Sequence, residues 1–366
     1  MRVLTRPDAV RIIHDDKAVT SLTRYFDVFQ NRKKAKFILA RKLSANFTDE
    51  YDLDKLWKIH ADLTNKYYDL EAKIDSNEMD FEAFSSPKKS YLDLKIEIAR
   101  RIMENCHLCE RKCGVNRLKD ELGFCRCGPE INVSTMFEHL GEEASLVPSF
   151  TIFTCGCTVY CVHCQNWSIA RWYEEGNGWT PRDIAKAIDR ARASGCRNAN
   201  LVGGEPTPWL EQWLEVFKHV ESNVPIVWNS NTWYSQDTAE LLAGFADVYL
   251  NDFKYGNNVC AVRISSAPKY FDVCTNNMLS AKKYGELLIR VLVLPGHLEC
   301  CTKEILHWIA KNLGKETRVN VMWQYRPEFE YNKVPELGRR LTREEKQRSC
   351  VIAKEAGLES LEPFSN

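Results

Sequence analysis

The sequence predicts an α/β fold in which six parallel strands alternate with helices. From about residue 150 onward, short runs of β-branched and aromatic residues alternate with helical segments of ten to seventeen residues. This alternation implies parallel strands joined by right-handed crossovers, and hence either an open doubly wound sheet or a barrel. In a barrel, the chemistry belongs at the carboxyl ends of the strands. The predicted strands cover residues 151–155, 198–203, 225–230, 247–252, 287–294 and 319–325.

The helix predicted after the first strand has signals at both of its ends. Thr180 is a suitable N-cap, Pro181 fits the first turn, and Gly195 can end the helix. This segment therefore supports the reading of the region as repeated strand and helix units.

The first part of the chain, residues 1–87, is predicted to be a helical extension. Its apolar residues recur close to the 3.6-residue period, which favours a helix that packs on the main domain over one that binds a separate partner. Residues 76–89 combine acidic residues, serines and a proline, and form the predicted linker to another helix at about 90–104. We expect this helix and a cysteine-rich metal- or cluster-binding segment over 88–148, and the α/β core over 149–366. The apolar stripe consists of Leu53, Leu56, Trp57, His60, Leu63, Leu70 and Ile74.

The composition is that of a globular protein with no electrostatic preference for an anionic partner. Of the 366 residues, 44% are hydrophobic, and the 50 basic residues equal the 50 acidic ones in number. This balance argues against nucleic acid or an anionic membrane as partner. The start of the chain lacks the apolar core of a signal peptide, and no stretch reaches the ~20 apolar residues of a membrane span. We expect a cytoplasmic protein, in which fifteen cysteines indicate metal binding or redox chemistry.

Three cysteines, Cys157, Cys161 and Cys164, follow directly after the first predicted strand. Neighbours in this set are four and three residues apart, which limits their separation to about 13 and 10 Å. One folded loop can therefore hold three corners of an iron–sulfur cube and leave one iron open. Structural zinc normally has four protein ligands, and His163 is a poor fourth because it sits directly beside Cys164. A catalytic zinc with three ligands also fits the pattern, as do three thiols without a metal.

The pattern Cys157-x3-Cys161-x2-Cys164 resembles the signature of the radical S-adenosylmethionine (SAM) superfamily. The letters CQNW after it resemble the branch related to pyruvate formate-lyase activating enzymes, often called PflX-like. The resemblance covers most of residues 106–357 and leaves the first hundred residues outside. It continues through CHLCERKCGVNR, GFCR, HLGEEASL, LVGGEPTP, DFKY, RVLVLPG and MWQYRP.

The resemblance implies a partial (βα)6 barrel and a 4Fe-4S cluster whose open iron binds the amino and carboxylate groups of SAM. An electron from the reduced cluster then splits SAM into methionine and a 5'-deoxyadenosyl radical, which abstracts a hydrogen atom from the substrate. Such an oxidoreductase needs a low-potential electron donor, a flavodoxin or a ferredoxin. By resemblance to activating enzymes, the substrate is a glycine in a partner protein. A peptide residue or a small molecule is the alternative substrate, and no acid or base is required for the first step.

The resemblance places SAM contacts at the strand ends. In VGGEP, Gly203 and Gly204 let the backbone approach a ligand, and the carboxylate of Glu205 can pair with a cationic amine. Later strand ends carry polar residues that suit SAM or substrate contacts, although each also suits a structural hydrogen bond. These residues are Asn229, Asn231, Asp252, Lys254, Arg290 and Gln324.

A second set of cysteines, Cys106, Cys109, Cys113 and Cys125, lies in the segment before the first strand, with Cys127 in reserve. Four ligands suffice for a closed zinc site or a second iron–sulfur cluster, and we favour the cluster. The segment is also basic, which suits a solvated face, a cluster that carries thiolate charge, or an acidic electron donor. The remaining cysteines lack metal spacing and are interpreted as small buried apolar residues: Cys155, Cys196, Cys260, Cys274, Cys300, Cys301 and Cys350.

A competing hypothesis is a non-catalytic protein in which both sets of cysteines bind zinc and the barrel is an interaction platform. Iron content and colour distinguish the two hypotheses, because an iron–sulfur protein is brown and a zinc protein is colourless.

Overall fold

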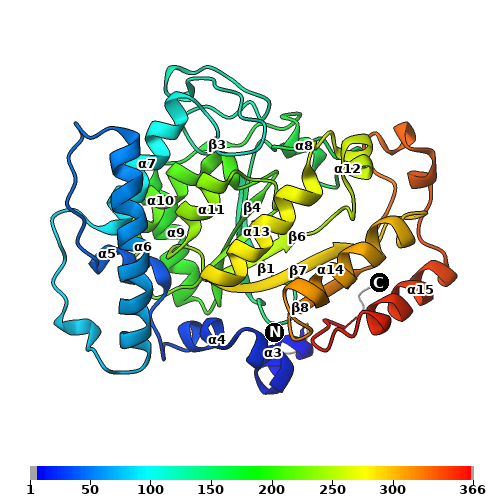
Figure 1. Cartoon of the computed structure of the whole chain (residues 1–366), viewed down its shortest axis with the longest axis horizontal. Coiled ribbons are helices and arrows are strands. Elements are labelled where there is room, and N and C mark those ends of the chain that lie inside the picture. Colours follow the sequence, from blue (N-terminus) through cyan, green and yellow to red (C-terminus); the bar gives the residue numbers. More distant parts are fainter. Residues whose placement is uncertain (1–5, 364–366) are drawn as a thin grey trace.

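The computed structural model describes residues 6–363, and its centre is one eight-stranded sheet (Figure 1). Strands β2, β4, β5, β6, β7 and β8 are adjacent in this order and parallel, and they are the six predicted strands. The α/β class is therefore confirmed. Residues 1–5 of the expected extension and 364–366 of the expected core lie outside the described residues. The strands are β1 (Asn132–His139), β2 (Ser149–Thr154), β3 (Asn177–Gly178), β4 (Asn198–Gly203), β5 (Ile226–Ser230), β6 (Val248–Asp252), β7 (Glu286–Leu292) and β8 (Arg318–Met322).

The sheet curves into a partial barrel. Strands β2 and β8 are separated by four other strands, yet the segments that follow both of them line one cavity. Only a curved sheet brings its first and last parallel strands to the same cavity, and the twist of adjacent strands provides that curvature. The expected partial (βα)6 barrel is thus confirmed, and the cavity lies at the carboxyl ends of its strands.

Two strands, β1 and β3, are not predicted by the sequence. β1 pairs antiparallel with β2 on its outer side, and β3 pairs antiparallel with β1. β1 does not alternate regularly between buried and exposed residues, and β3 is only two residues long. Neither therefore carries the period-two signal by which a strand is recognised.

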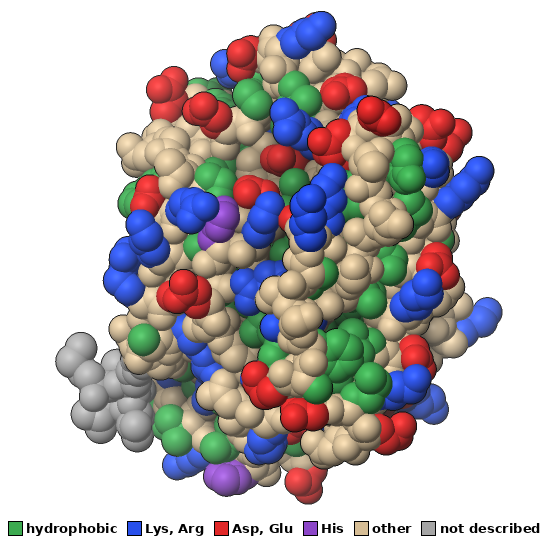
Figure 2. All heavy atoms as spheres, turned by 90° about the vertical axis from the view of Figure 1, so that its left-hand side faces the viewer, with side chains coloured by type: hydrophobic (Ala, Val, Ile, Leu, Met, Phe, Trp, Pro, Cys, Tyr) green, Lys and Arg blue, Asp and Glu red, His purple; other side chains and the backbone are tan. Residues whose placement is uncertain are grey.

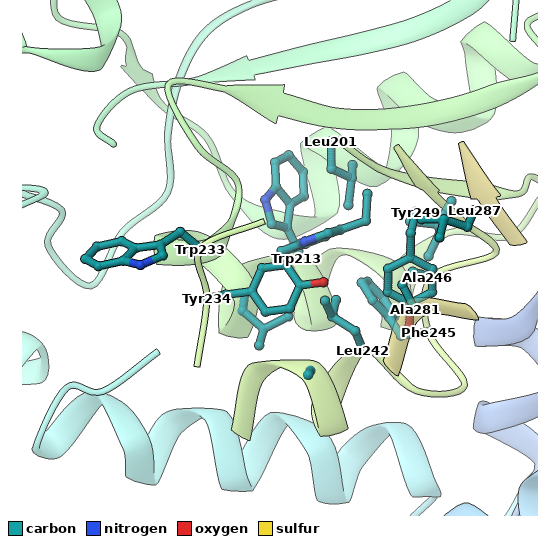
Figure 3. Close-up of a cluster of buried hydrophobic side chains, with 14 of the residues drawn as sticks. Leu201, Trp213, Trp233, Tyr234, Leu242, Phe245, Ala246, Tyr249, Ala281 and Leu287 are labelled. Atoms are coloured by element: carbon teal, nitrogen blue, oxygen red, sulfur yellow. The ribbon is translucent and has the colours of Figure 1, made fainter. Parts of the chain in front are cut away.

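Helices cover the outer face of the sheet and enclose a hydrophobic core (Figure 3). In the cluster drawn there, Trp213 of α10, Leu242 of α11 and Ala281 of α13 meet Leu201 of β4 and Tyr249 of β6. All five are buried, so this layer fixes the strands from outside. The helices of the core are α8 (Trp167–Ala170), α9 (Pro181–Ala193), α10 (Leu210–His219), α11 (Gln236–Leu242), α12 (Asn258–Ser265), α13 (Tyr270–Tyr284), α14 (Glu304–Asn312) and α15 (Arg343–Glu355).

The signals predicted for the first of the long core helices, α9, are confirmed. The Thr180 side chain accepts the N–H of Asp183, and Pro181 is the first helical residue. Gly195 lies just beyond the helix with a φ of 97°, a conformation that glycine adopts without strain.

The amino-terminal helices close the opposite end of the barrel. Helices α3 (Asp16–Ser21) and α4 (Thr23–Phe29) lie below the strands in Figure 1, after α2 (Pro7–Arg11). They contribute to a separate hydrophobic cluster with residues of β5, β6 and β7. The Glu286 carboxylate on β7 also accepts the backbone N–H groups of Arg24 and Tyr25 at 2.7 and 2.6 Å. The cluster includes Ile12, Ala18, Leu22, Tyr25, Phe26, Val227, Val248, Leu250 and Leu288.

Helices α5 (Lys36–Lys42), α6 (Leu53–Asp75) and α7 (Tyr91–Glu104) form the side of the molecule at the left of Figure 1. The predicted apolar stripe of α6 is buried or half-buried, and His60 in it is a packed side chain beside Tyr91 and Lys95. Figure 2 shows basic and acidic side chains intermixed on this face, in keeping with the balanced charge. Within residues 6–363, no helix is both long and apolar enough to cross a membrane.

Candidate active site

One cavity at the carboxyl ends of the parallel strands brings together the first set of cysteines and the residues predicted to contact SAM. The cysteines come from the loop after β2, and the other residues come from the ends of β4, β5, β6 and β7 or the turns that follow. Gln324, after β8, lines the cavity as well. The predicted residues that line it are Cys157, Cys161, Cys164, Gly203, Gly204, Glu205, Asn229, Asn231, Asp252, Lys254 and Arg290.

The loop that carries the three cysteines is held on two sides. On one side, Tyr160 and Val162 donate their backbone N–H groups to Ser265 and Ile264 of α12, at 2.8 and 3.0 Å. On the other side, Arg111 of the cysteine-rich segment donates to the carbonyl oxygen of Thr158 at 3.0 Å. The position of the loop therefore depends on both neighbours.

Gly156, at the start of this loop, allows a close contact that no other residue permits. Its φ is 85°, and a Cβ atom would lie 2.3 Å from the Sγ of Cys127 and 2.8 Å from the carbonyl oxygen of Cys125. The cysteine-rich segment thus packs directly against the backbone of the three-cysteine loop.

The three thiols form a donor set suited to an iron–sulfur cluster. Burial raises the pKa of the Cys157 thiol to about 12 and that of the Cys164 thiol to about 11. Thiols in such surroundings stay protonated at neutral pH unless a bound cation replaces the proton. The hydroxyl of Ser265 lies 2.9 Å from the Sγ of Cys161, so it can donate a hydrogen bond to a ligating sulfur.

Glu205 places a buried carboxylate in the same cavity. Its Oε1 accepts hydrogen bonds from the hydroxyls of Thr207 and Ser230 at 2.6 and 2.7 Å, and its Oε2 accepts the backbone N–H of Asn231 at 2.8 Å. Burial nevertheless raises the pKa of Glu205 above its usual value. A desolvated carboxylate of this kind gains from a cationic partner such as the amine of SAM.

The two glycines before Glu205 serve the packing of the backbone. A Cβ on Gly203 would lie 2.1 Å from the backbone nitrogen of Thr154, and one on Gly204 would lie 2.1 Å from the carbonyl oxygen of Gly156. Both therefore let the end of β4 approach the end of β2 and the three-cysteine loop. The sequence alone suggests approach to a ligand, whereas the structure adds this contact between two strand ends.

Asp252 and Lys254 form an ion pair at the cavity, with 2.6 Å between Oδ2 and Nζ. Burial acts to lower the pKa of Lys254, but the charge of Asp252 and the nearby thiols of Cys161 and Cys164 raise it above the ordinary lysine value. Lys254 is thus a fixed positive charge beside sulfurs that become negative when they ligate a metal.

Arg290 makes a bidentate contact with the carboxylate of Glu143, which is a residue of this protein and not part of a ligand. Its Nε and Nη2 each donate to Glu143 at 2.7 Å, and Nη2 also contacts Glu142. Asn320 of β8 donates to Glu143 at 2.8 Å. The sequence alone assigns no role to these glutamates, although they belong to the motif HLGEEASL, and the structure shows that they anchor Arg290.

The two predicted asparagines differ in their surroundings. The side-chain amide of Asn231 donates to the hydroxyl of Thr158 at 3.0 Å and points towards the Sγ of Cys157 at 3.7 Å. Asn229 lines the cavity, and no hydrogen bond engages its amide among residues 6–363. Asn229 is therefore available to a ligand, whereas Asn231 joins Glu205 to the cysteine loop.

The sequence alone does not identify four of the residues that line the cavity as SAM contacts: His163, Gln165, Asn166 and Ser230. His163 is buried, and its Nε2 lies 3.2 Å from the hydroxyl of Tyr255. Burial, with the charge of Lys254, lowers the pKa of His163 to about 3, so the ring is neutral. In the sequence, the CQNW stretch of the family resemblance is the feature that points to Gln165 and Asn166.

The second set of cysteines is folded into a compact segment. Cys106 exchanges backbone hydrogen bonds at 3.0 Å with Val115 and Gly114, and burial together with the charges of Cys125, Cys106 and Cys113 raises the pKa of Cys109. The charges of the other three thiols thus act on Cys109. Of residues 6–363, neither this set nor the first has three ligand atoms within 4.8 Å of one another, as ligands of a single ion do.

Two basic residues of this segment, Arg111 and Arg117, donate hydrogen bonds within the fold. Arg117 is buried and donates to the carbonyl oxygens of Cys127 and Gly128 at 3.0 and 2.7 Å. Arg111 donates to Thr158, and its guanidinium lies 3.8 Å from the ring centroid of Phe124. The interpretation as a solvated face is therefore wrong for Arg117, which is buried, whereas Arg111 is half-buried.

One interpretation of the remaining cysteines is also wrong. Cys260, Cys300 and Cys301 lack a metal-binding spacing in the sequence, yet the fold gathers them around His297 with all ligand atoms within 4.8 Å of one another. They are more than small apolar residues, because thiols at this separation can share an ion.

Comparison with known families and proteins gives consistent matches. The family model of the radical SAM superfamily matches residues 151–309. The chain is 43% identical over 344 residues to "Uncharacterized protein MJ0674" of Methanocaldococcus jannaschii, covering 92% of this chain and 98% of that protein. It is 24% identical over 291 residues to "Uncharacterized protein MJ0808" of the same organism, covering 69% of this chain and 82% of that protein.

Among solved structures, the chain is similar in fold to SuiB of Streptococcus suis. The crystal structure of SuiB bound to S-adenosylmethionine matches with a TM-score of 0.43 and 12% identity, over 57% of this chain and 48% of that one. The structure bound to the precursor peptide SuiA matches with a TM-score of 0.41 and 14% identity, over 57% and 46%. This chain thus spans about half the length of these solved chains.

Proposed function

The chain belongs to the radical SAM superfamily, whose members bind a 4Fe-4S cluster and SAM, and from this premise we propose that it removes a hydrogen atom from a glycine of a partner protein. The observation that carries the proposal is the single cavity that joins the three-cysteine loop to Glu205 and the polar strand ends. When bound, the cluster supplies one electron to SAM, which yields methionine and a 5'-deoxyadenosyl radical that takes the hydrogen atom.

We assign the residues of the cavity to the two cofactors by their chemistry. Cys157, Cys161 and Cys164 are the thiolate ligands of the cluster, and Lys254 balances their charge. Glu205 pairs with the amine of SAM, and the amide of Asn229 is available to its carboxylate or ribose groups. These residues hold and orient the cofactors, and the barrel walls limit access of water.

A protein substrate is supported by aromatic residues next to the cavity. Trp167 follows Asn166, which lines the cavity, and its ring is stacked on that of Phe329 with 5.6 Å between centroids. Tyr173, which is 68% exposed, packs edge-on against Trp167 with 5.1 Å between centroids. Exposed aromatic side chains are typical of surfaces that bind another protein.

The second set of cysteines supports a route for the electron. Its Cys125 and Cys127 contact Gly156 of the three-cysteine loop, so a second cluster there would lie beside the first. A cluster rather than zinc at this set is part of the proposal, because an iron–sulfur cluster can carry an electron whereas zinc has no redox chemistry. A flavodoxin or ferredoxin then delivers the electron to this outer cluster.

A radical modification of a peptide or a small molecule is the alternative within the same chemistry. Membership of an enzyme superfamily argues against the non-catalytic zinc protein considered from the sequence.

The first experiment tests the cofactor assignment. The protein is reconstituted with iron and sulfide without oxygen, and methionine and 5'-deoxyadenosine are measured after addition of SAM and dithionite. The wild type and a Cys350→Ala control, in which the changed cysteine lies outside the cavity, should cleave SAM. Cys161→Ala should lose this activity while its circular dichroism stays unchanged. Equal activity in Cys161→Ala would refute the assignment of the loop.

The second experiment tests the substrate. Protein extracts from cells grown with α-deuterated glycine are incubated with the reconstituted enzyme, SAM and reductant, and the mass of 5'-deoxyadenosine is measured. Transfer of deuterium, with a carbon-centred radical signal on a protein, supports the glycine proposal. Transfer from other labelled amino acids or from a protein-free fraction, and none from glycine, supports a peptide residue or a small molecule as the substrate.

A further inference from the structure

Four side chains that do not line the cavity converge between α12 and the segment after β7. Cys260 lies on α12, His297 lies in the turn after β7, and Cys300 and Cys301 lie in the π-helix η5 (Leu298–Lys303). All four ligand atoms are within 4.8 Å of one another. The sequence separates Cys260 from His297 by 37 residues, so the fold alone creates this group.

The distances within the group are those of ligands that share one tetrahedral ion. The Sγ of Cys300 lies 4.0 Å from that of Cys260 and 3.9 Å from that of Cys301. The Nδ1 of His297 lies 3.6 and 3.4 Å from the Sγ atoms of Cys260 and Cys300. Bond lengths of about 2.3 Å for Zn–S and about 2.0 Å for Zn–N in a tetrahedron give S–S and S–N separations of about 3.8 and 3.5 Å. An iron–sulfur cube is excluded, because its thiolates each bind a different iron.

The backbone is shaped to bring adjacent cysteines to one point. A π-helix is rare and is often found at functional sites. Here it packs on Gly256, where a Cβ would lie 2.8 Å from the carbonyl oxygen of Cys300 and from the Cα of Cys301. Asn257 donates to the carbonyl oxygen of Cys300 at 2.9 Å and accepts the backbone N–H of Cys260 at 2.8 Å. Asn257 therefore links the two segments that carry the thiols.

His297 is oriented by a carboxylate on its far side. Its Nδ1 faces the thiols, and its Nε2 lies 3.2 Å from the Oε1 of Glu336. Metal-binding histidines typically donate their second ring N–H to a carboxylate, which fixes the tautomer that leaves the first nitrogen free to ligate. Arg263 contacts both Glu336 and His297, and its charge balances the excess negative charge of three thiolates around a divalent ion.

We propose that Cys260, His297, Cys300 and Cys301 bind one zinc ion, which fastens α12 to the segment after β7. Three thiolates and one imidazole are a closed structural zinc site. His297 and Cys301 are buried, whereas Cys300 is exposed and gives the ion a path to the site. This site is separate from the proposed function and does not depend on the identity of the substrate.

The zinc would also support the three-cysteine loop from a distance. α12 carries Cys260 in its first turn and ends with Ser265, which contacts both Tyr160 and the Sγ of Cys161. An ion that holds the start of α12 therefore limits the motion of the helix end that carries these contacts.

The test measures zinc in the protein by mass spectrometry, after purification without oxygen, incubation with an excess of zinc over all the cysteine sites, and exhaustive washing. Cys260→Ser and His297→Gln should each contain one zinc per chain less than the wild type. Cys350→Ser should match the wild type, because Cys350 is partly buried like Cys260 but lies outside the group. The test compares zinc per chain between the wild type and each ligand variant. Zinc at the second set of cysteines is present in all of these proteins and therefore does not affect the difference.

X-ray absorption at the zinc edge gives a second readout. It leaves the four proposed ligands unchanged, so it can be used even if a ligand variant fails to fold. With Cys109→Ala as background to remove zinc from the cysteine-rich segment, the proposal predicts three sulfur neighbours at about 2.3 Å and one nitrogen at about 2.0 Å. Glu336→Gln should bind zinc about 10 to 100 times more weakly. Equal zinc in the wild type and both ligand variants, or a wild type that retains none, would overturn the proposal.

Discussion

Asn231 donates its backbone N–H to the carboxylate of Glu205 at 2.8 Å, and its side-chain amide points to the Sγ of Cys157. One residue thus joins the carboxylate assigned to the amine of SAM with a sulfur assigned to the cluster. This residue, which directly follows β5, therefore fixes the separation between the proposed SAM site and the proposed cluster. SAM must lie close to the cluster in order to bind its open iron.

The charge of Glu205 should govern the affinity for SAM. Glu205→Gln retains most of the hydrogen-bonding shape but loses the negative charge, and hydrogen bonds to a charged group contribute about 1.5 to 3 kcal/mol. We expect SAM to bind about 10 to 100 times more weakly, with iron content unchanged, in equilibrium dialysis with labelled SAM. Glu211→Gln is a matched control on α10, outside the cavity. Equal affinity in Glu205→Gln and the wild type would contradict the role of this carboxylate.

The hydroxyl of Ser265 should tune the cluster. It lies 2.9 Å from the Sγ of Cys161, and a hydrogen bond to a ligating sulfur stabilises the reduced, more negative cluster. Ser265→Ala should therefore shift the reduction potential to a more negative value, measured by redox titration with electron paramagnetic resonance. Ser349→Ala, whose hydroxyl lies near Trp323 instead, should leave the potential unchanged. A potential that is equal in all three proteins would show that Ser265 has no such effect.

The contacts of Arg290 should be essential to stability. Arg290 is held by Glu143 and Glu142 inside the barrel, and removal of one partner from a buried ion pair costs about 3 to 5 kcal/mol. Glu143→Gln should therefore shift unfolding in urea to much lower concentration. Lys66→Ala removes an exposed ion pair with Asp62 and should change stability by less than about 1 kcal/mol. Similar losses in the two variants would contradict the importance of the buried pair.

The same cluster should make stability depend on acidity. Burial acts to raise the pKa of Glu142, but Arg290 and His139 lower it to about 2, from a usual value of 4.5. A carboxyl with a lowered pKa in the folded state contributes stability above pH 4.5 that is lost as the pH falls through about 2. The shift corresponds to about 3 kcal/mol. Glu142→Gln should therefore lose less stability than the wild type between pH 4.5 and 2, measured by urea unfolding at each pH, and parallel curves would contradict this.

The sequence predicts the parallel strands well because each is a short apolar run between helical segments. A strand that is buried on both faces is apolar along its whole length, so it can be recognised without knowledge of the rest of the fold. β1 and β3 lie at an edge of the sheet, where one face meets solvent and the pattern is weak. Local periodicity therefore identifies buried strands and misses irregular edge strands.

The site could be predicted where its residues are close in sequence and follow a known motif. The partner of Arg290 lies 147 residues away, and the thiol of Cys260 meets His297 across 37 residues. Only the fold determines such contacts, because the spacing of residues in the sequence does not indicate which distant residues meet. For the same reason, the packing role of Gly203 becomes visible only beside Thr154.

The most direct test of the central claim is electron paramagnetic resonance of the reduced, reconstituted Cys109→Ala protein, in which the second set of cysteines is disabled. We predict a 4Fe-4S signal whose g values change when SAM is added, and the loss of that signal in Cys109→Ala combined with Cys161→Ala. A signal that ignores SAM, or that persists without Cys161, would contradict the claim that the loop after β2 presents an open iron to SAM.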